Sequence, residues 1–287
     1  MMPQTLPIGA VLTAQELAER LADTATQALI DEARLSPKPG LVDSRSSGAH
    51  QDLTLDLMVR SARSLTPTFY ALALHSWQRP ADIALRQEVG RLGRTGEARM
   101  MAATGGVNTH RGAIWAMGLL VSAVAMQPEN LMPQHIAQRA AKIAKLPDAF
   151  SPKKFSKGAH AVQRYQVPGA REEAQSGFPH IIDCALPQLH HSRTRGASES
   201  EAQVDALLAV MTRLSDTCVL SRGGLPALEA MHQGAQAVLD AGGLQTRAGK
   251  QRLRHLEQQM LADNASPGGA ADLLAATLFL DRVSVPD

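Results

Sequence analysis

The sequence predicts an all-α protein, a single-domain multi-helix bundle in which glycine-rich loops precede several helix starts. Three observations support this prediction. Long stretches are filled with Ala, Leu, Gln, Glu and Arg, which are good helix formers. No alternating run of Val, Ile and Thr bounded by turns predicts a strand. A capping box, Thr13-Ala-Gln-Glu16, begins a first helix that we expect to run to about Leu35 and to end before Pro37.

The remaining helices follow from the same composition and from the spacing of apolar residues. Residues 147–200 contain clustered Pro, Gly, Lys, Ser and His, and they predict long loops with short helices, mobile in part. We find no domain boundary, so we expect residues 1–287 to form one domain. The further helices are expected near 50–75, 81–103, 109–127, 133–146, 201–218, 225–240, 247–262 and 269–283.

Composition argues against several classes of function. The formal net charge is +2, which predicts no strong field for a polyanion, and aromatic residues are only 3% of the chain. Nucleic-acid modules that stack bases depend on aromatic side chains, so we expect no nucleic-acid partner. The longest apolar run, 112–126, is too short to span a bilayer, and the N-terminus has no basic signal-peptide region. These features predict a cytoplasmic protein without a membrane partner.

The stretch ATGGVNTHRG at 103–112 places His110 and Arg111 at a predicted helix start. The backbone amides there already carry partial positive charge, so two cations either point into water or accompany a bound anion. Two similar turns, 216–224 and 266–269, also precede predicted helices. Any one glycine-bearing turn is weak support, but three of them suggest a polyanionic ligand.

Several acidic residues occupy unexpected places. Glu32 falls on the apolar stripe of the first predicted helix, so it is either solvated at the helix end or directed into an interior site. Asp52 and Asp56 are four residues apart on a predicted helix, which indicates either a solvated flank or a magnesium site. Glu97 lies one turn before two methionines and is either exposed or functional.

Standard catalytic motifs are absent from the sequence. We find no HExxH or CxxC metal motif, no Walker A or GxGxxG nucleotide motif, and no GxSxG nucleophile elbow. The chemistry, if the protein is an enzyme, is therefore expected to use carboxylates, cations and magnesium.

Six stretches that run in order along most of the chain resemble the triphosphoribosyl-dephospho-CoA synthase family. NTHRG and SPKPGLVD are the most specific of them, and GGVNTHRGAIW is more similar to the malonate decarboxylase branch than to the citrate lyase branch. The stretches are EARLSPKPGLVD (32–43), GAHQD (48–52), GEARMMAATGGVNTHRGAIWAMGLL (96–120), KGAHAVQRYQVPGAREEAQSGFP (157–179), DTCVLSRGG (216–224) and SPGGAADLLA (266–275).

The resemblance implies a transferase with an α-helical fold. ATP is attacked at ribose C1 by the 2′-hydroxyl of 3′-dephospho-CoA, adenine leaves, and the product is 2′-(5″-triphosphoribosyl)-3′-dephospho-CoA. A separate holo-transferase would pass this product to an acyl carrier protein, and Mg²⁺ would accompany the ATP. Breaking an N-glycosidic bond builds oxocarbenium character, so the site needs a base, negative charge near the sugar, and an acid for adenine.

The site residues that we expect on this basis fall into three groups. Glu32 or Glu97 is the candidate general base or oxocarbenium-stabilising carboxylate, and the sequence does not choose between them. His110 is a further catalytic candidate, and Asp43, Asp52 and Asp56 are candidate magnesium ligands. The candidate phosphate-binding or substrate-binding residues are Lys38, His50, Gly106, Asn108, Thr109, Arg111, Lys157, Arg171, Arg222, Gly223 and Gly268.

Two other functions are compatible with the same residues. One is an all-α, magnesium-dependent nucleotide or ADP-ribose hydrolase that uses the same carboxylates without dephospho-CoA. The other is a non-catalytic helical protein that docks a partner. The sequence leaves the oligomeric state open, and a homodimer is plausible.

Overall fold

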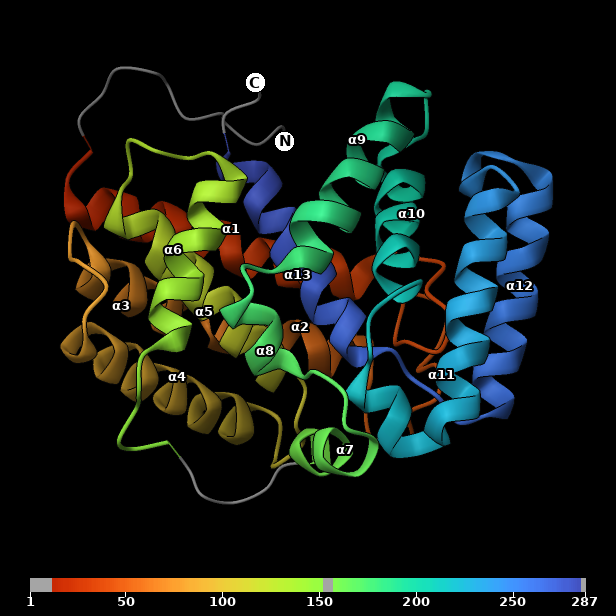
Figure 1. The fold of residues 1–287 in the computed structure, drawn as a ribbon, viewed down its shortest axis with the longest axis horizontal. Helices are drawn as coiled ribbons and strands as arrows, with labels where there is room; N and C mark the ends of the chain where they lie inside the picture. Colours follow the sequence, from red (N-terminus) through yellow and green to blue (C-terminus); the bar gives the residue numbers. More distant parts are fainter. Residues whose placement is uncertain (1–11, 152–156, 285–287) are drawn as a thin grey trace.

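The computed structural model describes residues 12–151 and 157–284, and these residues confirm the all-α prediction because they contain helices and no strand. Figure 1 shows one assembly of helices with α5 and α13 in its middle. In chain order the elements are α1 (Ala14–Arg34), α2 (Leu55–Ser64), α3 (Thr66–Ser76), α4 (Ile83–Ala103), α5 (Arg111–Met126), α6 (Pro133–Lys145), α7 (Lys157–Tyr165), α8 (Ala170–Gln175), the π-helical turn η1 (His180–Ala185), α9 (Leu186–Thr194), α10 (Glu199–Met211), α11 (Thr217–Asp240), the 3₁₀ turn η2 (Gly243–Gln245), α12 (Arg247–Ala262) and α13 (Gly268–Val283).

The central helices α5 and α13 are apolar on every side. Both are buried along nearly their whole length, and they contact each other. A helix that is hydrophobic all round is stable only in a protein interior, so the flanking helices α1, α3 and α10 pack around this pair. The first turns of α5 and α13 therefore meet inside the molecule, and this arrangement positions the candidate site.

Helix α12 shows the opposite pattern and covers α11, beside which it lies at the right edge of Figure 1. Its residues Leu253, Leu256 and Met260 are buried, whereas the opposite side presents Arg247 and Arg254 to solvent. This amphipathic division is typical of a surface helix.

Two of the expected helix boundaries were wrong. The single helix expected at 50–75 is two helices, α2 and α3, that meet at Leu65. Pro67 lies in the first turn of α3, where a proline is tolerated, although it could not continue an existing helix. Helix α2 begins only at Leu55, so Asp52 lies outside it and is not one helical turn from Asp56.

The expected helix at 201–218 ends at Met211 instead. Asp216 is the N-cap of the next helix, α11, which begins at Thr217 and not near residue 225. The stretch that the sequence indicated as a turn, 216–224, is therefore the first part of α11, with a kink at Gly224. That residue has φ +69°, which a glycine adopts without strain.

Residues 147–200 contain more helix than expected, because α7, α8, η1 and α9 occupy most of the described part of this segment. The indole Nε1 of Trp115 donates to the carbonyl of Ala170 at 3.0 Å, which ties the start of α8 to α5. Residues 152–156 lie outside the described residues. The expected mobility of part of 147–200 stays a prediction. Among the described residues no helix is both long and apolar enough to cross a bilayer.

Candidate active site

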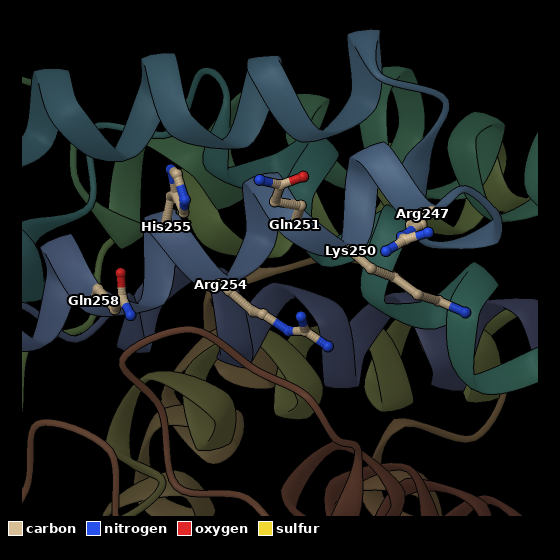
Figure 2. Close-up of a pocket in the computed structure, with 6 residues that line it drawn as sticks. All are labelled: Arg247, Lys250, Gln251, Arg254, His255 and Gln258. Atoms are coloured by element: carbon tan, nitrogen blue, oxygen red, sulfur yellow. The ribbon is translucent and has the colours of Figure 1, made fainter.

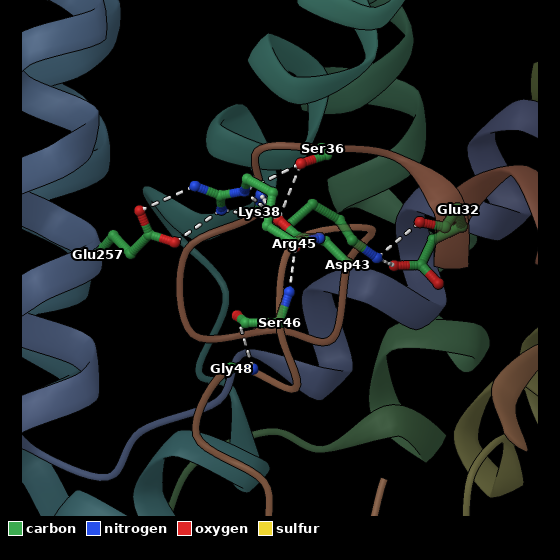
Figure 3. Close-up of polar contacts among 8 residues, drawn as sticks. All are labelled: Glu32, Ser36, Lys38, Asp43, Arg45, Ser46, Gly48 and Glu257. Atoms are coloured by element: carbon green, nitrogen blue, oxygen red, sulfur yellow. Dashed lines mark hydrogen bonds and ion pairs between the residues drawn. The ribbon is translucent and has the colours of Figure 1, made fainter. Parts of the chain in front are cut away.

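The loop after α1 brings a lysine into the protein interior. Lys38 turns back along α1, and its ammonium Nζ lies 2.5 Å from Glu32 Oε1 and 2.6 Å from the Glu32 carbonyl oxygen (Figure 3). The two side chains are only 2% and 4% exposed. Glu32 is therefore an interior carboxylate, as one of the two sequence interpretations required, and it is held by a buried counter-charge.

Asp43 organises this loop and does not face a ligand. Its two oxygens accept hydrogen bonds from the backbone amides of Lys38, Arg45 and Ser46, and from the guanidinium of Arg45. Arg45 also pairs with Glu257 on α12, as Figure 3 shows. The Arg45 bonds outweigh burial and hold the pKa of Asp43 below its usual value. In this structure the oxygens of Asp43 are occupied within the loop, and magnesium binding by Asp43 stays a prediction.

The other two predicted magnesium ligands also lie apart from any site. Asp52 and Asp56 are exposed, and Asp52 lies only in a loose 3.8 Å approach to His50. No group of three or more His, Cys, Asp or Glu side chains able to hold a metal occurs in the described part of the chain. The three predicted aspartates therefore form no such group, and their role with magnesium stays a prediction.

The loop after α1 packs against the residues that precede α13. A Cβ on Gly40 would lie 2.6 Å from the carbonyl oxygen of Ala265, so only glycine allows this approach. His50 Nε2 lies 2.8 Å from Ser266 Oγ, and Arg222 donates from its guanidinium to His50 Nδ1 at 3.1 Å. Burial and the charge of Arg222 lower the pKa of His50. His50 and Arg222, predicted to bind phosphate, thus connect the loop after α1 to helix α11 and to the residues before α13.

His110 is the N-cap residue of α5 and is almost fully buried, at 2% exposure. Its Nδ1 lies 2.8 Å from Ser61 Oγ, which also lies 2.6 Å from Thr109 Oγ1. Its other nitrogen, Nε2, is buried without a hydrogen-bond partner. Burial, with a smaller contribution from the Lys38 ammonium, lowers the pKa of His110 to about 4. The imidazole is therefore neutral near pH 7 and keeps one unused hydrogen-bonding nitrogen.

Asp216 holds the starts of two helices together. One carboxylate oxygen accepts from the amides of Cys218 and Val219 in α11, and the other accepts from the amide of Ala270 in α13 at 2.9 Å. Asp216 is 1% exposed, and burial raises its pKa. The anion at these two helix starts is thus a carboxylate of the protein itself.

Asp272 lies where the starts of α5 and α13 meet. Its carboxylate accepts a hydrogen bond from the amide of Ala113, and a Cβ on Gly112 would lie 2.0 Å from its Oδ2. Burial, followed by the charges of Glu32 and Asp216, raises the pKa of Asp272 well above its usual value. Asp272 is therefore a carboxylic acid that stays protonated at a pH where an ordinary aspartate is ionised.

Asp272 also reaches open space. Together with Gly112, Trp115, Asp216 and Gly269 it lines a small pocket of about 60 Å³ beneath the start of α8. A pocket of this size admits only part of a nucleotide. The arrangement of a protonated Asp272, the Glu32–Lys38 pair and the neutral His110 is referred to below as the buried cluster.

The phosphate cradle predicted at the start of α5 takes a different form. The amide of Arg111 is capped by Asn108 Oδ1 at 3.2 Å, and the amide of Ala113 is taken by Asp272. Arg111 itself pairs with Glu97 on α4. The amides of Arg111 and Ala113 are thus taken by protein side chains, and the binding of phosphate by residues 108–111 stays a prediction.

The two candidates for the catalytic carboxylate, Glu32 and Glu97, lie in different surroundings. The Glu97 side chain is about one-third exposed and is engaged by Arg111, whereas Glu32 is buried near Asp272. Only Glu32 belongs to the buried cluster.

The remaining predicted residues are placed as follows. A Cβ on Gly223 would lie 2.4 Å from the Ala227 Cβ, and one on Gly268 would lie 3.1 Å from Cys218 Sγ, so both glycines serve helix packing. Gly106 has φ +91° and open space around it. Arg171 is exposed in the first turn of α8. Lys157 begins α7, and its side chain lies outside the described residues.

A surface hollow of about 720 Å³ lies along the exposed side of α12 (Figure 2). It is lined by residues of that one helix, among them Arg247, Lys250 and Arg254, and Lys250 pairs with Glu201. None of the residues of the buried cluster lines it. The buried cluster, and not this basic face, is therefore the candidate site.

Sequence reasoning missed Asp216 and Asp272 as site residues. Asp216 precedes an apolar helix at the position of an N-cap, and Asp272 occupies the first turn after SPGG. Both signals were present, but an aspartate at a helix start is ordinary, and only the packing of α5 against α13 brings them together.

The fold and the site define an all-α protein whose carboxylates, lysine and histidine converge at glycine-rich helix starts. The sequence model of the ATP:dephospho-CoA triphosphoribosyl transferase family matches residues 18–287. The chain therefore belongs to this family, as the resemblance of its motifs indicated.

Individual relatives agree with the family match. A protein of Klebsiella pneumoniae named 2-(5″-triphosphoribosyl)-3′-dephosphocoenzyme-A synthase is 70% identical over 273 residues, which are 95% of this chain and 98% of the relative. A protein of Azotobacter vinelandii named "Probable 2-(5″-triphosphoribosyl)-3′-dephosphocoenzyme-A synthase" is 57% identical over 280 residues, covering 96% and 94%. A solved structure from Archaeoglobus fulgidus, 18% identical, has a TM-score of 0.49 over 76% of this chain and 96% of that one, a likeness too weak to carry an argument.

Proposed function

We propose that the protein transfers the triphosphoribosyl group of ATP to the 2′-hydroxyl of 3′-dephospho-CoA and releases adenine. Membership of the family supports the reaction class. The observation that carries the assignment of the site is the raised pKa of Asp272 beside the buried Glu32 carboxylate. A carboxyl group whose pKa is raised, next to a carboxylate that is ion-paired with a lysine, offers the acid and the negative charge that the reaction needs.

In this proposal Asp272 is the general acid. The bond between ribose C1′ and adenine N9 breaks with its electron pair moving to adenine, and the Asp272 proton is transferred to the departing base. A protonated carboxyl beside the leaving group lowers the barrier for a poor leaving group. The small pocket in front of Asp272 admits the reacting part of the nucleotide.

Glu32 is proposed as the carboxylate that faces the sugar. Its negative charge would stabilise the oxocarbenium character at C1′, and it would accept the proton of the 2′-hydroxyl as the new C1′–O bond forms. Lys38 positions Glu32, because two short hydrogen bonds from its ammonium fix the end of α1. The unpartnered Nε2 of His110 is available to hydrogen-bond the substrate at the same place.

Magnesium belongs to the proposal as the companion of the ATP triphosphate. Bound there, it would neutralise phosphate charge. We assign no side chain to it, because the described residues contain no cluster of three or more candidate ligands and no step depends on the metal.

The finer biological role is also a proposal. The similarity of residues 105–115 to the malonate decarboxylase branch supports a product that a separate holo-transferase passes to the carrier protein of malonate decarboxylase. A comparison of apo carrier proteins from the two pathways, each supplied with this product and its holo-transferase, tests that role. Exclusive labelling of the citrate lyase carrier would contradict it.

The reaction is tested by mass spectrometry of the purified protein with ATP, 3′-dephospho-CoA and magnesium. We expect adenine and the triphosphoribosyl adduct in equal amounts. Adenine without adduct would indicate a nucleotide hydrolase, and the absence of both, with no ATP binding by calorimetry, would favour a docking protein. Either result would refute the proposed transfer.

A further inference from the structure

Helices α4 and α5 line a second pocket, of about 210 Å³. Apolar side chains including Leu72, Val89 and Ile114 line part of it, and Trp115 is shared with the small pocket. A Cβ on Gly93 of α4 would meet no atom within 4 Å, so this glycine leaves the wall open.

Three arginines line this space, which we name the arginine pocket: Arg86, Arg94 and Arg111. Two carboxylates oppose them. Asp148 lies 3.3 Å from Arg86 and 2.8 Å from Arg94, and Glu97 pairs with Arg111. The lining therefore carries one positive charge in excess. Arg171, at the start of α8, adds a further positive charge near enough to Arg86 to contribute to the lowering of its pKa, which burial causes in the main.

Arg86 has an unsatisfied donor. Its side chain is more than nine-tenths buried, yet its Nε has no hydrogen-bond partner. The guanidinium lies over the Trp115 ring, 5.4 Å from the ring centroid, and has one acceptor, Asp148. Buried guanidinium groups are almost always fully hydrogen-bonded, so an unpaired donor on an arginine that lines this pocket points to an acceptor supplied by a ligand.

We infer that the arginine pocket binds the polyphosphate chain of a nucleotide substrate. Planar guanidinium groups bind phosphate oxygens in pairs, and three of them around an apolar-walled space suit a chain of linked phosphates. The pocket lies beside the buried cluster, because Arg111 is flanked in sequence by His110 and by Gly112, which touches Asp272. A nucleotide held by its phosphates here would extend its ribose past Trp115 towards Asp272.

This inference rests on the proposed function for the identity of the nucleotide, and two sources share the chemistry. One is the triphosphate of ATP, and the other is the diphosphate of 3′-dephospho-CoA. Arg111 was predicted from the sequence to bind phosphate, and here it does so by its side chain beside Arg94 and not through the amides of α5.

Calorimetry with inorganic tripolyphosphate and with pyrophosphate tests the pocket without reference to catalysis. We expect saturable binding that Arg94→Met weakens at least about tenfold, because a hydrogen-bonded charge pair contributes roughly 1.5–3 kcal/mol. Arg91→Met is the matched control, since Arg91 is on the same helix but exposed and paired with Glu88. Arg94→Lys should recover part of the affinity. In the Trp77→Phe background the bound phosphate should also change the emission of Trp115.

Steady-state kinetics identify the source. Arg94→Met should raise the KM for ATP or for 3′-dephospho-CoA at least about tenfold, and the substrate affected is the one whose phosphates occupy the pocket. The inference would be overturned if Arg94→Met had the wild-type KM for both substrates. It would also be overturned if the variant bound tripolyphosphate as tightly as the wild type. Arginine-dependent tripolyphosphate binding without adenine release would retain the pocket while refuting the proposed reaction.

Discussion

Replacing Lys38 by methionine removes the positive charge that is ion-paired with the buried Glu32 carboxylate. The ammonium makes hydrogen bonds of 2.5 Å and 2.6 Å to the carboxylate and to the carbonyl oxygen of the same residue. Methionine keeps most of the length of the side chain, so the perturbation is the loss of charge and of both hydrogen bonds.

The expected magnitude follows from burial. Both side chains are at most 4% exposed, so solvent cannot replace the lost partner. Removing one member of such a buried pair costs about 3–5 kcal/mol in the free energy of unfolding. For a chain of this size that corresponds to a fall in Tm of roughly 10 °C.

Urea denaturation followed by circular dichroism measures the effect. The double variant Lys38→Met with Glu32→Leu should recover most of the lost stability, because it removes the uncompensated carboxylate as well. Lys250→Met is the matched control: Lys250 forms an exposed pair with Glu201, and its loss should cost less than about 1 kcal/mol. A Lys38→Met variant within about 1 kcal/mol of the wild type, or a double variant no more stable than the single one, would refute the reasoning.

Three further predictions concern the surroundings of the buried cluster. His110 has a pKa of about 4 in the fold against 6.5 when unfolded, so the wild type should lose up to roughly 3 kcal/mol of stability as pH falls from 6.5 to 4. His110→Gln should lack this part of the pH dependence in urea denaturation, and parallel profiles would contradict the burial of a neutral imidazole. Asp216→Ala removes the cap of two helices and should cost about 2–4 kcal/mol by the same method; a cost below about 1 kcal/mol would argue against the double cap. Asp43→Asn should lower Tm equally in EDTA and in magnesium, whereas a magnesium-dependent difference would restore Asp43 as a metal ligand.

The fold was predictable because its determinants are local in sequence. The capping box of Thr13 and Glu16 forms as expected, with Glu16 Oε2 accepting from the Thr13 amide at 2.9 Å. The apolar run of α5 is buried, as a run of that length without charges requires. Boundaries were less predictable where one residue decides between continuing a helix and starting another, as at Pro67.

The site was less predictable because it depends on which helix ends meet. The sequence placed Glu32 on an apolar stripe, and its burial follows from that position. It could not show that Lys38 turns back to Glu32 or that Asp272 lies against Gly112, because both contacts depend on tertiary packing. The sequence analysis did not single out the arginines of α4, because the position of Arg86 over Trp115 also depends on tertiary packing.

The central claim is that Asp272 in its protonated form donates to the departing adenine. Asp272→Asn preserves the shape and the hydrogen bond from the Ala113 amide but has no proton to transfer. The most direct measurement is the rate of adenine and adduct formation, by mass spectrometry, for the wild type and this variant. The account predicts equal amounts of both products from the wild type and a rate at least about 10²-fold lower from Asp272→Asn at unchanged fold. A variant that forms adduct as fast as the wild type would contradict the account.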